Sequence, residues 1–225
     1  MNALNAKALV SLVVLLVIMA ALIFLPAGTF KFWQAWVFLA VYFGSSFAIT
    51  LYLMKTDPQL LQRRMRGGPT AERQATQKII MSLTSLGFIA LLVVPALDHR
   101  FGWSHVPPAV ELGANAIVAL GFLGVLRVFK ENTYTSSTIE LSGDQRVIST
   151  GPYALVRHPM YASALAMLIG IPIALGSFFG LLVFAAISGA LIWRLLEEER
   201  FLAANLPGYT EYQKKGPKRL LPGVW

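Results

Sequence analysis

Cysteine is absent from this sequence, and charged residues are scarce. Without cysteine, the chain has no disulfide framework, no thiolate metal site and no cysteine nucleophile. The three histidines, His99, His105 and His158, are too scattered to form a recognisable metal motif, so we expect no bound metal. Only 13% of the residues are charged and 56% are hydrophobic, whereas a soluble domain carries about a quarter charged residues. This composition indicates a membrane protein.

Long apolar runs recur along the chain. Four of them approach the roughly 20 residues that a membrane-spanning helix needs: Ala8–Leu25, Phe32–Met54, Ile79–Leu97 and Ala109–Phe129. The first run has no convincing cleavage site after it, so we interpret it as a retained helix rather than a signal peptide. A fifth run, Ala162–Trp193, is longer and is interrupted near Gly170, Pro172 and Gly176, which predicts a hairpin of two short helices. The sequence therefore predicts an all-α integral membrane protein with about five membrane segments.

The net charge of +8 is concentrated in the segments after the second and fourth runs and in the C-terminal tail. The positive-inside rule then places the N-terminus, residues 55–78, residues 130–158 and the tail in the cytoplasm. Anionic lipid head groups account for these cations more simply than nucleic acid does, so we expect no nucleic-acid partner. Within the second segment, strand-like alternation around Ser142-Gly143-Asp144 predicts a short hairpin or an extended loop.

We divide the chain into two regions. Residues 1–108 hold three membrane helices, and residues 109–225 hold the cytosolic loop 130–158, the helical hairpin 159–196 and the tail 197–225. Both ends of the hairpin lie on the cytoplasmic side in this topology. The stretches "RHPMY" and "WRLLEEE" should therefore be neighbours, although more than thirty residues separate them.

Two groups of charged residues flank this hairpin. Pro159 suits the first position of a helix, and the start of a helix attracts anions. Arg157 and His158 would reinforce an anion site there, although such cations also occur simply at membrane boundaries. Arg194 and Glu198 are four residues apart and share one helical face. An ionisable group at the end of an apolar helix is costly and usually functional, which singles out Arg194.

The neighbouring Glu197 and Arg200 are better explained as a surface ion pair at the end of the helix. The remaining groups together suit a zwitterionic ligand. Its carboxylate would lie at the helix start, its ammonium on Glu198, and a second anionic group on Arg194. A cofactor with an amino-acid moiety meets this description, and S-adenosylmethionine is one.

These residues also resemble a known family. The stretches "GPYALVRHPMY" and "EERFLAANLPGYTEYQKKGPKRLLPGVW" look like the isoprenylcysteine carboxyl methyltransferase family, and most closely its bacterial members. The related phospholipid N-methyltransferases share the general plan. The strong resemblance covers about Lys130–Trp225, and "DPQLLQRR" is a weaker match in the first half.

The resemblance implies an S-adenosylmethionine-dependent carboxyl O-methyltransferase of the inner (plasma) membrane. It implies a cofactor pocket in the C-terminal part, open to the cytosol, with a lipophilic substrate arriving from the bilayer. Arg194 matches the arginine that engages the substrate carboxylate, and is our candidate catalytic and substrate-binding residue. The positions that match cofactor contacts are Val147, Ile148, Tyr153, His158, Pro159, Met160, Tyr161 and Glu198. Because three acids follow one another, a neighbour of Glu198 remains an alternative for the acidic contact.

Other functions remain open at this point. A carboxylate acceptor is already ionised at neutral pH and needs no general base, which suits a site without an obvious catalytic dyad. The alternatives are a methyltransferase acting on a lipid amine, a membrane reductase of the sterol C14 type that uses NADPH, and a non-enzymatic membrane scaffold. The sequence does not identify the natural acceptor.

Overall fold

Helices account for nearly all of the regular structure. A computed structural model describes residues 3–72, 74–141 and 145–225, and these residues contain no strand. The elements are α1 (Ala3–Ala27), α2 (Trp33–Thr56), α3 (Pro58–Met65), η1 (Pro69–Ala71), α4 (Ala75–Phe101), α5 (Pro108–Glu131), η2 (Gly151–Ala154), α6 (Pro159–Ala174), α7 (Gly180–Asn205) and α8 (Tyr209–Lys215). Within the described ranges, α1, α2, α4, α5 and α7 are long and apolar enough to cross a membrane. The predicted fold class, an all-α integral membrane protein, is confirmed.

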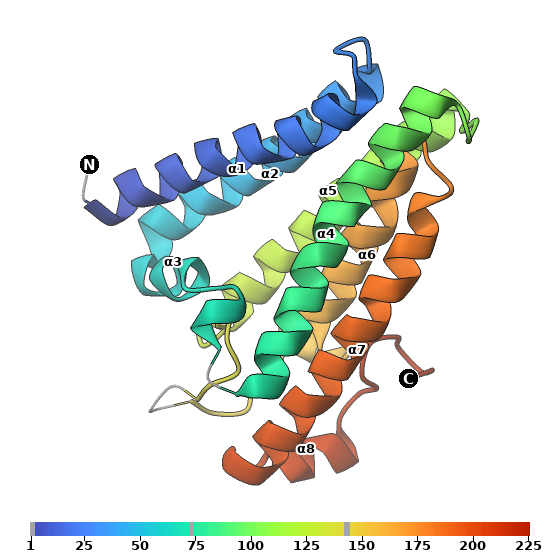
Figure 1. Ribbon diagram of the computed structural model, residues 1–225. Helices are drawn as coiled ribbons and strands as arrows, with labels where there is room; N and C mark the ends of the chain where they lie inside the picture. Colours follow the sequence, from blue (N-terminus) through green and yellow to red (C-terminus); the bar gives the residue numbers. More distant parts are fainter. Residues whose placement is uncertain (1–2, 73, 142–144) are drawn as a thin grey trace.

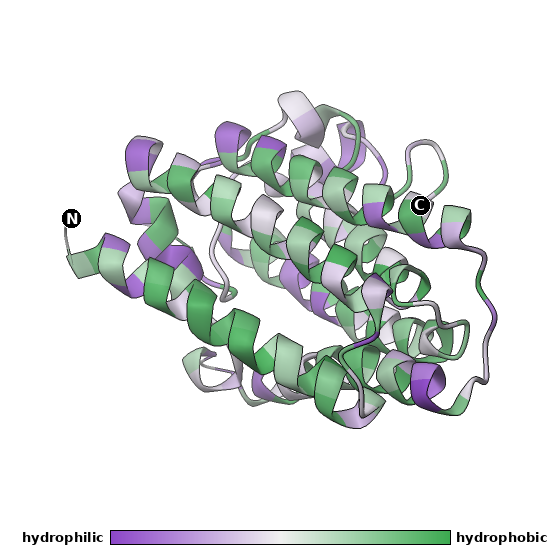
Figure 2. Ribbon diagram, turned by 90° about the horizontal axis from the view of Figure 1, so that it is seen from above, coloured by the Kyte–Doolittle hydropathy of each residue, from purple (hydrophilic) through white to green (hydrophobic). Residues whose placement is uncertain are grey.

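The long helices form a bundle in which α5 packs on α6, α4 on α7, and the α1–α2 pair on α4 and α5 (Figure 1). The α5–α6 contact is close because glycines lie at it. A Cβ added at Gly121 or Gly124 would collide with Met167 or Ser163, and one at Gly170 would lie 2.8 Å from Val118. Small residues at a helix contact let two backbones approach closely in the membrane. The outer faces of the bundle are largely apolar, as expected of surfaces that meet lipid (Figure 2).

The predicted helical hairpin is formed by α6 and α7, but its second arm is not short. Helix α7 has 26 residues and continues past Arg194 to Asn205, because the leucines, glutamates and alanines that follow are good helix formers. Helix α6 passes through Gly170 and Pro172 without breaking. The chain turns at Gly176, whose φ of 75° lies in the left-handed region that favours glycine. Residues 197–205, which the sequence analysis assigned to the tail, are therefore helical.

The segment 130–158 contains no strand in its described residues and is largely irregular between α5 and η2. The predicted turn at residues 142–144 lies outside the described residues. The flanking stretches instead fold against other elements. Ser137 Oγ donates to the Arg64 carbonyl at 2.9 Å, so this segment is attached to α3.

Helix α3 was missed by the sequence analysis, which described its surroundings as a loop. Its start has two standard signals. The Asp57 side chain accepts from the Leu60 amide at 2.8 Å, and Pro58 occupies the first helical position. Leu60 and Leu61 are buried, which fixes α3 against the end of the bundle. The C-terminal tail reaches the same end, where the Arg157 and His158 amides donate to the carbonyls of Lys218 and Arg219.

Candidate active site

A cavity of about 380 Å³ lies at the end of the bundle where α3, the irregular segment after α5, α6, α7 and α8 meet. This volume is in the range of small-molecule sites, which are roughly 300–1,000 Å³. Met81, Thr84 and Leu191 line its inner part from the membrane helices α4 and α7. The cavity therefore joins a polar, loop-covered region to the apolar part of the bundle.

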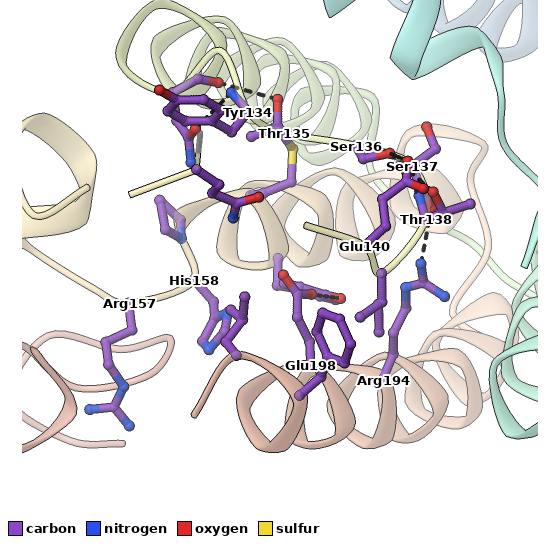
Figure 3. A pocket seen from close by; sticks show the side chains of 18 of the residues that line it. Tyr134, Thr135, Ser136, Ser137, Thr138, Glu140, Arg157, His158, Arg194 and Glu198 are labelled. Atoms are coloured by element: carbon purple, nitrogen blue, oxygen red, sulfur yellow. Dashed lines mark hydrogen bonds between the residues drawn. The ribbon is translucent and has the colours of Figure 1, made fainter. Parts of the chain in front are cut away.

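All nine residues that the sequence singled out line this one cavity. They are Val147, Ile148, Tyr153, His158, Pro159, Met160, Tyr161, Arg194 and Glu198. The predicted proximity of "RHPMY" and "WRLLEEE" is confirmed, because Tyr161 Oη donates to Glu198 Oε2 at 2.5 Å. In Figure 3 the Glu198 side chain stands between those of His158 and Arg194. Their roles toward a ligand stay predictions.

The adjacent acids Glu198 and Glu199 point to different surroundings. Successive residues of a helix are rotated by about 100°, so only one of the two can face the cavity directly. Glu198 lines the cavity, whereas Glu199 is buried, with 4% of its surface exposed. The third acid, Glu197, pairs with the exposed Arg200 at 2.6 Å, which confirms the predicted surface ion pair.

The Glu199 carboxylate accepts three hydrogen bonds. It accepts from Arg157 Nε at 2.9 Å, from His158 Nε2 at 3.1 Å and from Arg219 Nε at 2.7 Å. Arg157 and His158 were expected to attract a ligand anion at the start of α6. Their side chains instead contact the Glu199 carboxylate of the protein itself. Figure 3 shows Arg157 pointing away from the other labelled side chains. Glu199 therefore ties α7, the start of α6 and the tail together behind the cavity wall.

Arg194 is also paired, and with residues that the sequence analysis missed. Its Nη2 donates to Glu72 Oε1 at 2.6 Å and to the Ser137 carbonyl at 3.0 Å. Its Nη1 donates to Gln77 Oε1 at 3.0 Å. Glu72 and Gln77 are 4% and 1% exposed, so this is a buried ion pair with a neutral hydrogen-bond partner. Both lie more than a hundred residues before Arg194, and no spacing pattern could have linked them to it.

Arg64 of α3 is a second guanidinium at the cavity, also missed as a site residue. It follows the buried Leu60 and Leu61 by four and three residues, so the three share one side of α3. This spacing in the sequence could have shown that Arg64 lies on the same side of the helix as the buried leucines. Burial lowers the pKa of Arg64, and the positive charge of Arg194 acts in the same direction, whereas Tyr161 and Glu198 act to raise it.

Tyrosines supply hydroxyl groups to the cavity. Tyr153 Oη accepts from Asn132 Nδ2 at 2.9 Å, and Tyr212 Oη donates to the Tyr153 carbonyl at 2.7 Å. Burial raises the pKa of Tyr212 to about 12 and also raises the pKa values of Tyr153 and Tyr209. These groups are neutral hydroxyls at physiological pH. Tyr209 is 5% exposed, and its Oη has no hydrogen-bond partner among the described residues.

The residues around the cavity fit S-adenosylmethionine. The Glu198 carboxylate suits an ammonium group, and the unpartnered Tyr209 hydroxyl suits a polar ligand atom. Val147, Ile148 and Met160 add apolar surface to the same cavity. Within residues 3–72, 74–141 and 145–225, no three histidine, aspartate or glutamate side chains gather as a metal site would require.

Comparison with known proteins bears on the C-terminal part of the chain. Residues 110–207 match the model of the phospholipid methyltransferase family. The match spans less than half of the chain and is a likeness of that region to the family. It covers α5 to α7 and most of the cavity residues named above, but not Arg64, Glu72 or Gln77. It does not distinguish carboxyl from amine methylation.

Two bacterial proteins are similar over the same share of the chain. The cobalt-zinc-cadmium resistance protein CzcN of Cupriavidus metallidurans is 28% identical over 103 residues, which are 45% of this chain and 47% of that protein. The nickel-cobalt-cadmium resistance protein NccN of Alcaligenes xylosoxydans xylosoxydans is 25% identical over 104 residues, which are 45% of this chain and 48% of that protein. The chain thus matches about half the length of each relative.

Proposed function

We propose that this chain is an S-adenosylmethionine-dependent methyltransferase that methylates the carboxylate of a lipophilic, prenylcysteine-like acid. The observation that carries the proposal is the single cavity, which joins Glu198, Tyr161 and Arg194 to the apolar interior of a membrane bundle. The phospholipid methyltransferase match supports the methyltransferase part. The resemblance to bacterial isoprenylcysteine carboxyl methyltransferases supports the carboxylate part. The reductase alternative receives no support from the comparisons.

Guanidinium donors at the cavity wall support an anionic acceptor. Arg64, Arg146, Arg157 and Arg194 line the cavity. Glu199 pairs with Arg157 and Glu72 with Arg194, so Arg64 and Arg146 are the two without an ion pair among the described residues. A carboxylate that enters such a cavity loses water but gains guanidinium donors. Arg194 would orient the carboxylate, and Glu198 would bind the ammonium of the cofactor.

Methyl transfer to a carboxylate requires the protein mainly to position the cofactor and the acceptor. The bound cofactor would supply the methyl group. A carboxylate acceptor is already ionised at neutral pH, so no side chain must remove a proton from it. Holding two reactants in line can lower a barrier by about 7–11 kcal/mol in well-oriented systems. The apolar inner wall around Leu191 would exclude water from the reacting atoms.

A lipid amine is the second candidate acceptor, and one observation favours it. Glu72 already meets the charge of Arg194 at 2.6 Å, which reduces the attraction of Arg194 for a carboxylate. An amine acceptor must lose a proton before it can attack. Its methylation rate would therefore rise with pH toward the amine pKa, whereas the rate for a carboxylate would stay flat above about pH 6.

We further propose that the cavity faces the cytoplasm from the inner membrane. The basic segments support this orientation, because α3 and the C-terminal tail lie at the end of the bundle that holds the cavity. The positive-inside rule assigns such an end to the cytoplasm.

The experiment is methyl transfer by the purified protein in lipid vesicles with methyl-labelled S-adenosylmethionine. N-acetyl-S-farnesylcysteine serves as the acid, and dioleoylphosphatidylethanolamine as the amine. Alkali releases methanol from a carboxyl methyl ester and leaves an N-methyl group intact. Alkali-labile label in the acid is the expected result. Alkali-stable label in the amine lipid would replace the carboxylate proposal with the amine candidate.

A further inference from the structure

Arg64 differs from Arg157, Arg194 and Arg219 in forming no ion pair with a described acid. Arg157 and Arg219 pair with Glu199, and Arg194 pairs with Glu72. Among the described residues, no carboxylate lies within ion-pair distance of Arg64. Its charge nevertheless lies at the wall of the cavity.

The contacts of Arg64 hold its guanidinium in place without neutralising it. Nη1 donates to the Ser136 carbonyl at 2.7 Å, and the guanidinium carbon lies 5.4 Å from the centre of the Phe129 ring. A carbonyl and an aromatic face both favour a cation, but neither carries a net negative charge. The backbone of Arg64 is fixed as well, because its carbonyl accepts from Ser137 Oγ.

A partly buried cation without a directly bound counter-charge is costly unless a ligand supplies one. Glu198 lines the same cavity and acts on the Arg64 charge, but from beyond ion-pair distance. Burial lowers the pKa of Arg64, as expected of a cation removed from water. Arginine also offers several donors in a planar fork that matches a carboxylate or a phosphate. The arrangement is thus suited to an oxyanion that enters the cavity.

We propose that Arg64 binds the anionic group of the lipid acceptor, a carboxylate or a phosphate, and that it supplies the charge which Glu72 withdraws from Arg194. The inference rests on the proposed methyltransferase function and adds a substrate-binding residue to it. It places selection of the acceptor in α3, outside the region that matches the phospholipid methyltransferase family. In this arrangement Arg194 mainly orients the acceptor, because Glu72 offsets its charge.

The test compares Arg64→Gln with Arg66→Gln, a matched control that removes the same charge from an exposed position at the end of α3. Calorimetry in detergent measures binding of N-acetyl-S-farnesylcysteine, of its neutral methyl ester and of S-adenosylhomocysteine. Arg64→Gln should weaken binding of the acid about ten- to a hundredfold, as expected for loss of a charge-assisted hydrogen bond. Binding of the ester and of S-adenosylhomocysteine should be unchanged, and Arg66→Gln should match the parent protein.

Two further measurements identify the source of the anion and guard against misfolding. Lysophosphatidylethanolamine replaces the acid in a parallel titration, and a loss confined to it would assign the phosphate rather than the carboxylate. Arg64→Lys keeps the charge and should retain most of the affinity for the acid. If Arg64→Gln does not fold, the preference of Arg64→Lys for the acid over the ester still reports on the site.

Several outcomes would overturn the inference. Equal weakening of the acid and the ester would make Arg64 a structural residue of α3. Loss of S-adenosylhomocysteine binding alone would assign Arg64 to the cofactor. Failure of the proposed function is distinguishable, because these are binding measurements. Arg64-dependent binding without methyl transfer would refute only the function, and methyl transfer that Arg64→Gln leaves unchanged would refute only the inference.

Discussion

The cavity has an N-terminal wall, with Arg64 of α3 and Met81 and Thr84 of α4, and a C-terminal wall formed by lining residues between 132 and 212. The two walls differ in how their charged side chains are paired. The C-terminal wall lies largely in the region that matches a known family. Within it Glu199 pairs with Arg157 and also forms a hydrogen bond with His158. The N-terminal wall lies outside that region. From the N-terminal part of the chain Glu72 pairs with Arg194 beside the cavity, and Arg64 lines the cavity without an ion pair among the described residues. Under the proposals above, Glu198 of the C-terminal wall holds the cofactor, and Arg64 of the N-terminal wall binds the acceptor that Arg194 orients.

The ion pair between the two walls should give the largest effect. Arg194→Gln leaves Glu72 buried and unpaired, and breaking a buried pair in this way costs about 3–5 kcal/mol of stability. The double variant Glu72→Gln with Arg194→Gln removes both charges and should recover most of that loss. The free energy of unfolding in detergent, measured by denaturant titration, checks both. If the double variant is as unstable as the sum of the two single variants, the walls are not coupled through this pair.

A change within the C-terminal wall should affect the cofactor without affecting stability. Glu198→Gln removes the acid that faces the cavity and should weaken S-adenosylhomocysteine binding roughly ten- to 150-fold, since a hydrogen bond to a charged group contributes about 1.5–3 kcal/mol. Glu197→Gln, one residue earlier, is the matched control and should bind normally. Calorimetric titration measures both. Normal binding by Glu198→Gln would remove Glu198 from the cofactor site.

A pair that touches neither wall should give the smallest effect. Arg200 has 74% of its side chain exposed and pairs only with Glu197 three residues earlier. Arg200→Gln should change the free energy of unfolding by about 0–1 kcal/mol, because exposed ion pairs contribute little. If Arg200→Gln lost as much stability as Arg194→Gln, burial would not explain the difference between the Arg200–Glu197 and Arg194–Glu72 ion pairs.

Much of the C-terminal wall could be predicted from the sequence. The long apolar runs predicted the membrane helices, and the hairpin topology predicted that Tyr161 and Glu198 would meet. Glu198 was chosen from the resemblance, but three consecutive acids left a neighbour as an alternative. Rotation of the helix decides it, since it directs Glu198 to the cavity and Glu199 to Arg157 and His158.

The N-terminal wall was harder to predict for a physical reason. Glu72 and Gln77 reach Arg194 through tertiary packing of α4 on α7 and of η1 on α4, which leaves no periodic trace in the sequence. Helix α3 did carry local signals at Asp57 and Pro58, and these were overlooked. The strand-like alternation after α5 predicted a short hairpin or an extended loop. The described residues there are irregular and find hydrogen-bond partners in α3 rather than in a second strand.

The most direct test of the account is calorimetric titration of the detergent-purified protein with S-adenosylhomocysteine, with NADPH in a parallel run. The account predicts saturable binding of S-adenosylhomocysteine that is strongly reduced in Glu198→Gln, and no binding of NADPH. Binding of NADPH alone would move the protein to the reductases, and binding of neither ligand would contradict a cofactor site in this cavity.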